Sequence, residues 1–248
     1  MIASTIVLTV LALGLVFGLK HATEVDHVVA VTTIVSEQRK FWRATLVGAL
    51  WGAGHTLSLV CVGIIVLVLR RGVPAWVSGW LEFGVALMII TLGVTACLRA
   101  LRGRGRMHMH RHRHDGFAHV HVHFHEEDTA HEGANLTHSH AVRRIGLKPL
   151  LVGAMHGLAG SAALTLLVLM QIASPLVGVL YLLVFGAGSI VGMLLMSGLV
   201  GLPFILTAGK LDRFHYGLQA IAGALSICFG LWYAYETGIA SGLLAAIL

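Results

Sequence analysis

The sequence has few charged residues, and this scarcity excludes an ordinary water-soluble domain. Only 11% of the 248 residues are Asp, Glu, Lys or Arg, whereas about a quarter is usual in soluble proteins. Apolar residues make up 57%, and the mean hydropathy is +0.86. The chain therefore has the composition of an integral membrane protein.

Several other features are missing from the sequence. The three cysteines, Cys61, Cys97 and Cys228, lie inside apolar blocks and form no CxxC pair, so no disulfide framework is indicated. The apolar N-terminal stretch has no basic region before it, which argues against a secretory signal peptide. No nucleotide-binding motif is present, so an ATPase would need another subunit. The net charge of +6 comes from basic residues between apolar blocks, which argues against a nucleic-acid partner.

The apolar blocks are long enough to cross a bilayer, for which about 20 residues suffice. We expect an all-α, polytopic membrane helix bundle of about six transmembrane helices. Pro149–Gly209 is long enough for two spans with a break near Gln171–Pro175, and the other four blocks provide one span each: Met1–Leu19, Ala44–Leu69, Trp76–Leu98 and Phe214–Tyr235.

Basic residues between the spans predict the orientation. The first, third and fifth loops carry three, nine and two Lys or Arg residues, whereas the second carries two and the fourth none. Because basic loops stay on the cytoplasmic side, we expect the odd loops to be cytoplasmic and both termini to face outward. The expected location is a prokaryotic plasma (inner) membrane.

The two halves of the chain resemble each other weakly. LKHATEVDHVV aligns with AMHGLAGSAAL, which pairs His21 with His156 at an offset of 135. WGAGHT aligns with FGAGSI at an offset of 134, and Trp80–Gly93 aligns with Gly217–Gly230 at an offset of 137. Three spans in each half would invert the second half relative to the first, as in many secondary transporters. We expect two inverted three-helix repeats, at 1–98 and 148–248.

The segment His21–His27 combines two imidazoles and two carboxylates within a predicted span. Ionisable side chains inside a membrane are functional candidates by default, and imidazole with carboxylate suits a divalent transition metal. On a straight helix His21 and His27 would lie about 120° apart around the axis. Either the helix unwinds here, which Gly14 and Gly18 upstream would permit, or only some of these residues bind.

Two further intramembrane histidines, His55 and His156, follow small residues that let helices approach closely. The predicted metal ligands are therefore His21, Asp26, His27, His55 and His156. Glu24 and Ser161 are weaker candidates, and we leave out Glu82. We interpret Met155 as core packing. No catalytic residue and no cofactor is predicted.

The loop between the halves, residues 99–147, contains eleven of the sixteen histidines. His-rich tracts are typical of metal binding, and this composition gives no packed core. We expect a cytoplasmic, disordered segment that buffers or senses the metal and lies outside the transport pathway.

At these residues the chain resembles a known family. HATEVDH fits the His-x4-Asp-His signature of nickel/cobalt permeases, and AGHTLSLV is similar to the Gly-His-Ser/Thr segment of a later helix. The six-span plan with a His-rich central loop is more similar to the related nickel/cobalt exporters and the urease- or hydrogenase-accessory membrane proteins. The resemblance implies roles in metal recognition for His21, Asp26, His27 and His55.

The sequence thus predicts a membrane transporter, not an enzyme, with Ni²⁺ or Co²⁺ as its transported substrate. A transporter of zinc, iron or manganese and a non-transporting metal-delivery protein stay open, because these metals share ligand types. The expected partners are the metal ion and the lipid bilayer, with a second copy of the chain or a cytoplasmic metallochaperone as further candidates.

Overall fold

The computed structural model of the chain describes residues 2–105, 107–114, 117–124, 146–159, 168–172, 174–208 and 211–245. The elements in chain order are α1 (Ile2–His21), α2 (Val25–Val35), α3 (Phe41–Leu69), α4 (Ala75–Gly105), β1 (Met107–His114), β2 (Phe117–Phe124), α5 (Lys148–Leu158), α7 (Pro175–Thr207), α8 (Asp212–Ala234) and the π-helix η2 (Tyr235–Ala240). Residues 168–171 are also helical. The architecture is an α-helical bundle with one two-stranded hairpin.

Within the described part of the chain, four helical segments are long and apolar enough to cross a membrane: α3, α4, α7, and α8 together with η2. A fifth candidate span is the pair α1 and α2, which is bent by 53° at a short break. The remaining predicted span begins at α5, but residues 160–167 lie outside the described part of the chain. The membrane bundle is thus confirmed with four to five candidate spans, and the sixth stays a prediction.

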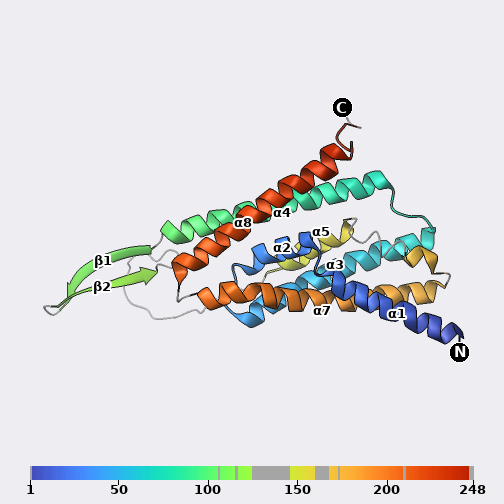
Figure 1. Cartoon of the computed structure of the whole chain (residues 1–248), viewed down its shortest axis with the longest axis horizontal. Helices are drawn as coiled ribbons and strands as arrows, with labels where there is room; N and C mark the ends of the chain where they lie inside the picture. The colour runs from blue at the N-terminus through green and yellow to red at the C-terminus, as the bar shows by residue number, and fades with distance from the viewer. Residues whose placement is uncertain are drawn as a thin grey trace, which may run out of the picture.

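The helices form two groups (Figure 1). In one group, α3 packs against both α7 and α5, and α1 packs against α7. In the other group, α4 packs along α8. Within each of the pairs α3–α7 and α4–α8 the two helices run in opposite directions, and α2 lies between the groups (Figure 1).

Glycines allow the helices of the first group to touch through their backbones. A Cβ at Gly54 of α3 would collide with the carbonyl oxygen of Leu150 in α5, and a Cβ at Gly153 would collide with that of Trp51. Small residues at membrane helix interfaces permit this approach. The backbones of α3 and α5 are therefore in close contact, which fixes the position of α5 on α3.

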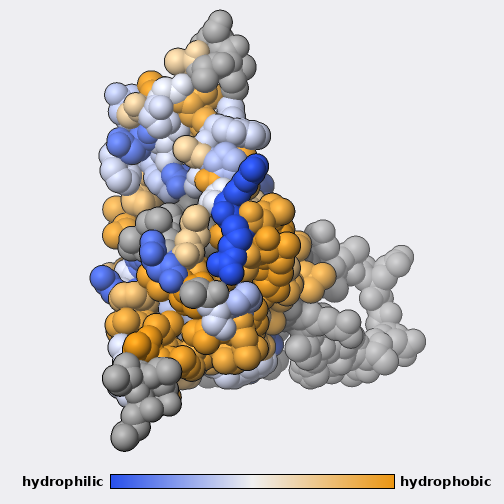
Figure 2. All heavy atoms as spheres, turned by 90° about the vertical axis from the view of Figure 1, so that its right-hand side faces the viewer, coloured by the Kyte–Doolittle hydropathy of each residue, from blue (hydrophilic) through white to orange (hydrophobic). Residues whose placement is uncertain are grey.

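The outer surface of the bundle is apolar. Large exposed side chains such as Leu57, Ile65 and Val68 on α3 are more than half exposed, at 61%, 56% and 75%, as expected for side chains that face lipid. Figure 2 views the end of the bundle at which the N-terminus lies; orange apolar spheres form its broad lower flanks, and hydrophilic spheres gather across the middle and upper part. The exposed apolar side chains thus lie on the outer surface of the bundle.

The His-rich segment differs in part from our expectation of disorder. Its strands β1 and β2 pair antiparallel, with His110 opposite His121 in the register. The alternation of His with a second residue has the two-residue period of a strand, a signal that the sequence analysis did not use. Residues 125–145, with their four histidines, lie outside the described residues, and the domain boundaries stay a prediction.

Candidate metal centre

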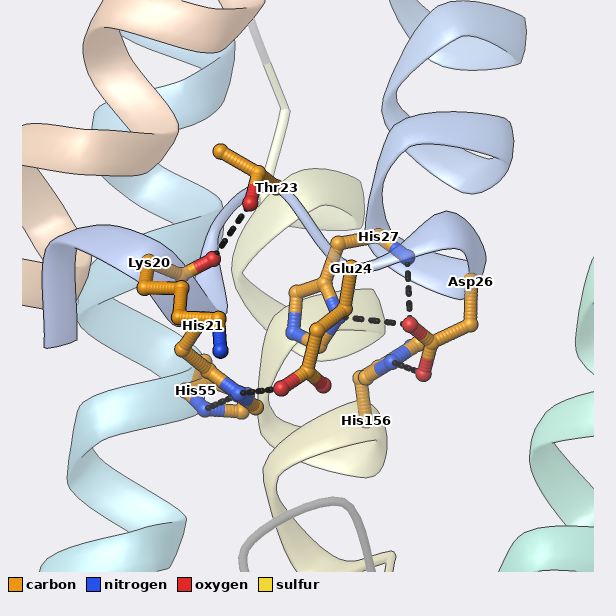
Figure 3. Close-up of polar contacts among 8 residues, drawn as sticks. All are labelled: Lys20, His21, Thr23, Glu24, Asp26, His27, His55 and His156. Carbon is orange, nitrogen blue, oxygen red and sulfur yellow. Dashed lines mark hydrogen bonds and ion pairs between the residues drawn. The ribbon is translucent and has the colours of Figure 1, made fainter. Parts of the chain in front are cut away.

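The structure brings all five predicted ligands to one place between the two helix groups. His21 ends α1, Asp26 and His27 lie in the first turn of α2, His55 lies in the middle of α3, and His156 lies near the end of α5 (Figure 3). The four histidines are at most 4% exposed. Side chains far apart in the sequence thus form one buried cluster.

A break in the helix turns His21 and His27 toward each other. Of the two alternatives left by their angular separation, the unwound helix is the one observed. The Thr23 hydroxyl donates to the carbonyl oxygen of Lys20 at 2.6 Å, and Glu24 is extended, with φ −64° and ψ 145°. A threonine hydroxyl that bonds to nearby backbone competes with the helix ladder. The two imidazole rings then meet with their centroids 4.4 Å apart.

Gly14 and Gly18 have a different role from the one we expected. Both lie inside the regular helix α1. A Cβ at Gly18 would collide with the carbonyl oxygen of Phe185, and a Cβ at Gly14 would lie 2.9 Å from Cδ2 of Tyr181. These glycines therefore allow α1 to pack closely against α7. The break in the helix lies at the residues after His21.

The Asp26 carboxylate joins two histidines. Its Oδ1 accepts from the backbone N–H of His27 at 2.9 Å and lies 3.0 Å from Nδ1 of the same residue. Its Oδ2 lies 2.8 Å from Nε2 of His156. An ionised carboxylate only accepts, so His27 Nδ1 and His156 Nε2 carry the hydrogens. In the neutral imidazole, the other nitrogen of each ring carries a lone pair. These two nitrogens, His27 Nε2 and His156 Nδ1, have no hydrogen-bond partner among the described residues.

The same reasoning assigns the second half of the cluster. His21 Nδ1 lies 3.0 Å from Oε1 of Glu24, and His21 Nε2 lies 3.0 Å from Nε2 of His55. If His21 donates to the Glu24 carboxylate, then its Nε2 accepts from His55. The remaining nitrogen, His55 Nδ1, is a buried lone pair without a partner among the described residues. Buried polar atoms without partners often mark sites for an ion.

Among the described residues, two groups of ligand atoms are compact enough to hold a metal ion. The atoms of His21, His27 and His55 lie within 4.8 Å of one another, and so do those of Asp26, His27 and His156. His27 belongs to both groups, and its ring centroid is 4.1 Å from that of His156. The arrangement can therefore bind one divalent cation at the centre or pass it between two overlapping ligand sets.

Trp51 was missed as part of the site, although it begins the WGAGHT motif. Its ring stacks on His27, with centroids 6.1 Å apart and an interplanar angle of 19°. It stands one turn before His55, which is the spacing that places two side chains on the same helix face. A small cavity beside His27 is lined by Trp51 together with Ala22, Val31, Met193 and Met196.

The weaker candidates have separate outcomes. Glu24 contacts His21 and belongs to the edge of the cluster, since 42% of its side chain is exposed. Ser161 lies outside the described residues. Met155 is 41% exposed, so it is not a core residue within this chain. Glu82 is half-buried on α4 and belongs to neither compact group of ligand atoms.

The fold and this cluster define a class, that of polytopic membrane proteins with a buried histidine and carboxylate centre. The chain is 36% identical over 240 residues to the urease accessory protein UreH of Bacillus sp. (strain TB-90), and the match covers 95% of both chains. The chain therefore belongs to the family of the urease accessory protein UreH. This agrees with the similarity to urease-accessory membrane proteins seen in the sequence.

No family model matches the chain. No solved structure matches it either.

Proposed function

We propose that this protein moves a divalent transition-metal cation, nickel or cobalt, across a prokaryotic plasma membrane through the His21–Asp26–His27–His55–His156 centre. The observation that carries the proposal is the convergence of four buried imidazoles and one carboxylate inside a membrane bundle. Buried ionisable groups in a membrane are costly and mark ion pathways. The single carboxylate offsets part of the charge of a dication.

The ligand types suit nickel and cobalt, and zinc and iron share them. The ligand atoms of each compact group lie within 4.8 Å of one another, which is close enough to hold one ion. The choice of nickel or cobalt over the other metals therefore rests on the family to which the chain belongs.

The name of the relative points to nickel. It is a urease accessory protein, and urease is a nickel enzyme, so we infer that nickel carried by this chain supplies such an enzyme. The alternatives are transport of zinc, iron or manganese and metal delivery without transport. In transport and in metal delivery alike, a cytoplasmic metallochaperone would be the partner that receives the metal.

We further infer that the bundle consists of two inverted repeats, because its glycine contacts are reciprocal. Gly18 meets the carbonyl of Phe185, and the repeat-related Gly153 meets that of Trp51. In a two-fold arrangement every contact occurs twice with the partners exchanged. The pairs Gly54 with Leu150 and Gly188 with Leu15 obey the same rule, as do Gly93 with Ile227 and Gly230 with Ile90.

The test is flux of radioactive nickel into proteoliposomes that contain the purified protein. We expect time-dependent uptake that cobalt inhibits strongly and that zinc and manganese inhibit weakly. Liposomes containing the His27→Ala variant are the control. Nickel binding without any flux would favour the metal-delivery alternative, and stronger inhibition by zinc than by cobalt would overturn the choice of metal.

A further inference from the structure

The ligand set is divided between two groups of helices. His21, His55 and His156 belong to α1, α3 and α5; α1 and α3 pack against α7, and α5 packs against α3. Asp26 and His27 belong to α2, which also contacts α4 and α8. A displacement of α2 would therefore separate two ligands from the other three.

We propose that Thr33, Ser226, Glu37 and Arg99 are positioning residues that fasten α2 to the α4–α8 pair, so that Asp26 and His27 move with that pair when the ion is released. The proposal rests on the proposed transport function and specifies which part of the bundle opens the site.

The first attachment is a buried pair of hydroxyls between α2 and α8. Thr33 Oγ1 and Ser226 Oγ are 2.5 Å apart, and the two side chains are 2% and 1% exposed. The carbonyl oxygen of Val29 lies 3.0 Å from Thr33 Oγ1 and 3.3 Å from Ser226 Oγ. One assignment uses both hydrogens: Thr33 donates to Val29, and Ser226 donates to Thr33. The Ser226 hydroxyl, whose partners both lie on α2, is satisfied only while α2 and α8 keep this register.

The second attachment is an ion pair at the end of α2. Glu37 follows α2, and its carboxylate pairs with the guanidinium of Arg99 in α4. Thr33 and Glu37 lie four residues apart, on either side of the C-terminal end of α2. Together the two attachments hold this end of α2 against α8 and α4.

The contact of α2 with α7 is of another kind. Val31 lines the small cavity with Met193 and Met196, and Val35 packs where a Cβ at Gly201 would meet its Cγ1 at 2.7 Å. These contacts are apolar and have no preferred direction, unlike the hydrogen bond and the ion pair that join α2 to α8 and α4. Directional bonds to α4 and α8 and an apolar face toward α7 together favour motion of α2 with the α4–α8 pair.

Both groups of helices are built to move as units. Glycine contacts lock α1, α3, α5 and α7 through their backbones, and Gly93 of α4 likewise meets the carbonyl oxygen of Gly223 in α8. The break between His21 and Val25 interrupts the helix, so α2 is not a continuous extension of α1. Rocking of one helix group against another around a central site is a common transport motion.

The first experiment compares nickel flux with nickel binding, using Ni²⁺ as the probe. The Thr33→Val/Ser226→Ala variant should bind nickel within about threefold of the parent but lower the maximal flux by about tenfold, because it breaks the attachment without touching a ligand. Thr32→Val is the matched control, since the Thr32 hydroxyl donates to Val28 of its own helix at 2.5 Å. It should leave flux unchanged.

The ion pair offers a test that does not disturb the buried core. Glu37→Arg and Arg99→Glu should each lower the flux, and the double exchange should restore it. If the exchanged pair fails to restore flux, or if the Thr33→Val/Ser226→Ala variant transports as fast as Thr32→Val, the inference is wrong. Absence of flux in the parent protein would instead refute the proposed function.

A cross-link gives a third outcome. In a chain whose natural cysteines are replaced by alanine, Thr33→Cys and Ser226→Cys should form a disulfide on oxidation. The oxidised protein should still transport nickel, because α2 and α8 move together. Loss of flux on oxidation, with nickel binding retained and flux recovered on reduction, would overturn the proposal.

Discussion

At the residue scale, the centre depends most on the two histidines that meet across the helix break. His21→Ala and His27→Ala each remove a buried donor, and His27 belongs to both compact ligand groups. In protein lacking residues 108–140, we expect either variant to lose nearly all nickel binding in calorimetry. Met155→Leu is the control, because its side chain lies outside the centre. Nickel binding equal to that of the parent in both histidine variants would refute the site.

The carboxylate of Asp26 should matter through its charge as well as its shape. Asp26→Asn keeps an oxygen for His27 but removes the negative charge that offsets a dication. We expect nickel affinity to fall by more than tenfold, above about 1.4 kcal/mol. His156→Ala should be milder, close to tenfold, because three imidazoles and the carboxylate remain. An Asp26→Asn variant with unchanged affinity in the same titration would show that the charge is not needed.

The five residues of the cluster could be singled out because each is an ionisable group where the membrane makes such groups costly. The roles of individual nitrogens could not be predicted, since they depend on which atoms meet across helices that are distant in the sequence. Nothing in the sequence indicated that Oδ2 of Asp26 contacts Nε2 of His156. Trp51 was missed because an aromatic residue in an apolar span is ordinarily packing.

At the element scale, the close contact of α3 and α5 should be intolerant of any side chain at Gly54. A Cβ there collides with the backbone of Leu150, which cannot move aside as a flexible side chain would. We expect Gly54→Ala to destabilise the protein by about 1–3 kcal/mol, as overpacking does. Gly84→Ala is the matched control, because its Cβ would lie at an ordinary 3.5 Å from Cε of Met155.

Thermal unfolding in detergent, followed by circular dichroism, compares the two glycine variants. Gly54→Ala should unfold at a lower temperature than the parent, and Gly84→Ala should unfold at the same temperature or above. Equal unfolding temperatures for both variants would contradict the close approach of α3 and α5.

The helix elements could be predicted from their apolar blocks. The angle between His21 and His27 left an unwound helix as one of two alternatives. The cause of the break could not be predicted: Gly14 and Gly18 offered a source of irregularity, whereas the Thr23 hydroxyl bond and the extended Glu24 lie at the break itself. The strands β1 and β2 could not be predicted from composition, although the alternation of histidine has the period of a strand.

At the scale of the whole molecule, the His-rich loop and the membrane centre should be separable. Replacement of residues 108–140 by a flexible linker leaves every described ligand of the centre in place. We therefore expect this variant to retain nickel flux in proteoliposomes, with a change in apparent affinity or regulation. Complete loss of flux in a variant that folds and binds nickel would make the loop part of the pathway.

The orientation of the molecule leads to a labelling experiment. The first, third and fifth loops carry most of the basic residues, so we expect them in the cytoplasm. Single cysteines placed in the loop between α4 and α5, in a chain without natural cysteines, should react with a membrane-impermeant maleimide only after cells are opened. Labelling of the same cysteines in intact cells would reverse the orientation.

The glycines that let carbonyl oxygens of one helix touch another also decide how this family can vary. A complete substitution survey should find two kinds of forbidden position. At the ligands, replacements should abolish nickel handling while the protein still accumulates in the membrane. At Gly18, Gly54, Gly153 and Gly188, even alanine should reduce accumulation itself. The abundance of each variant, measured beside its activity, would thus distinguish the chemistry of the centre from the scaffold that holds it.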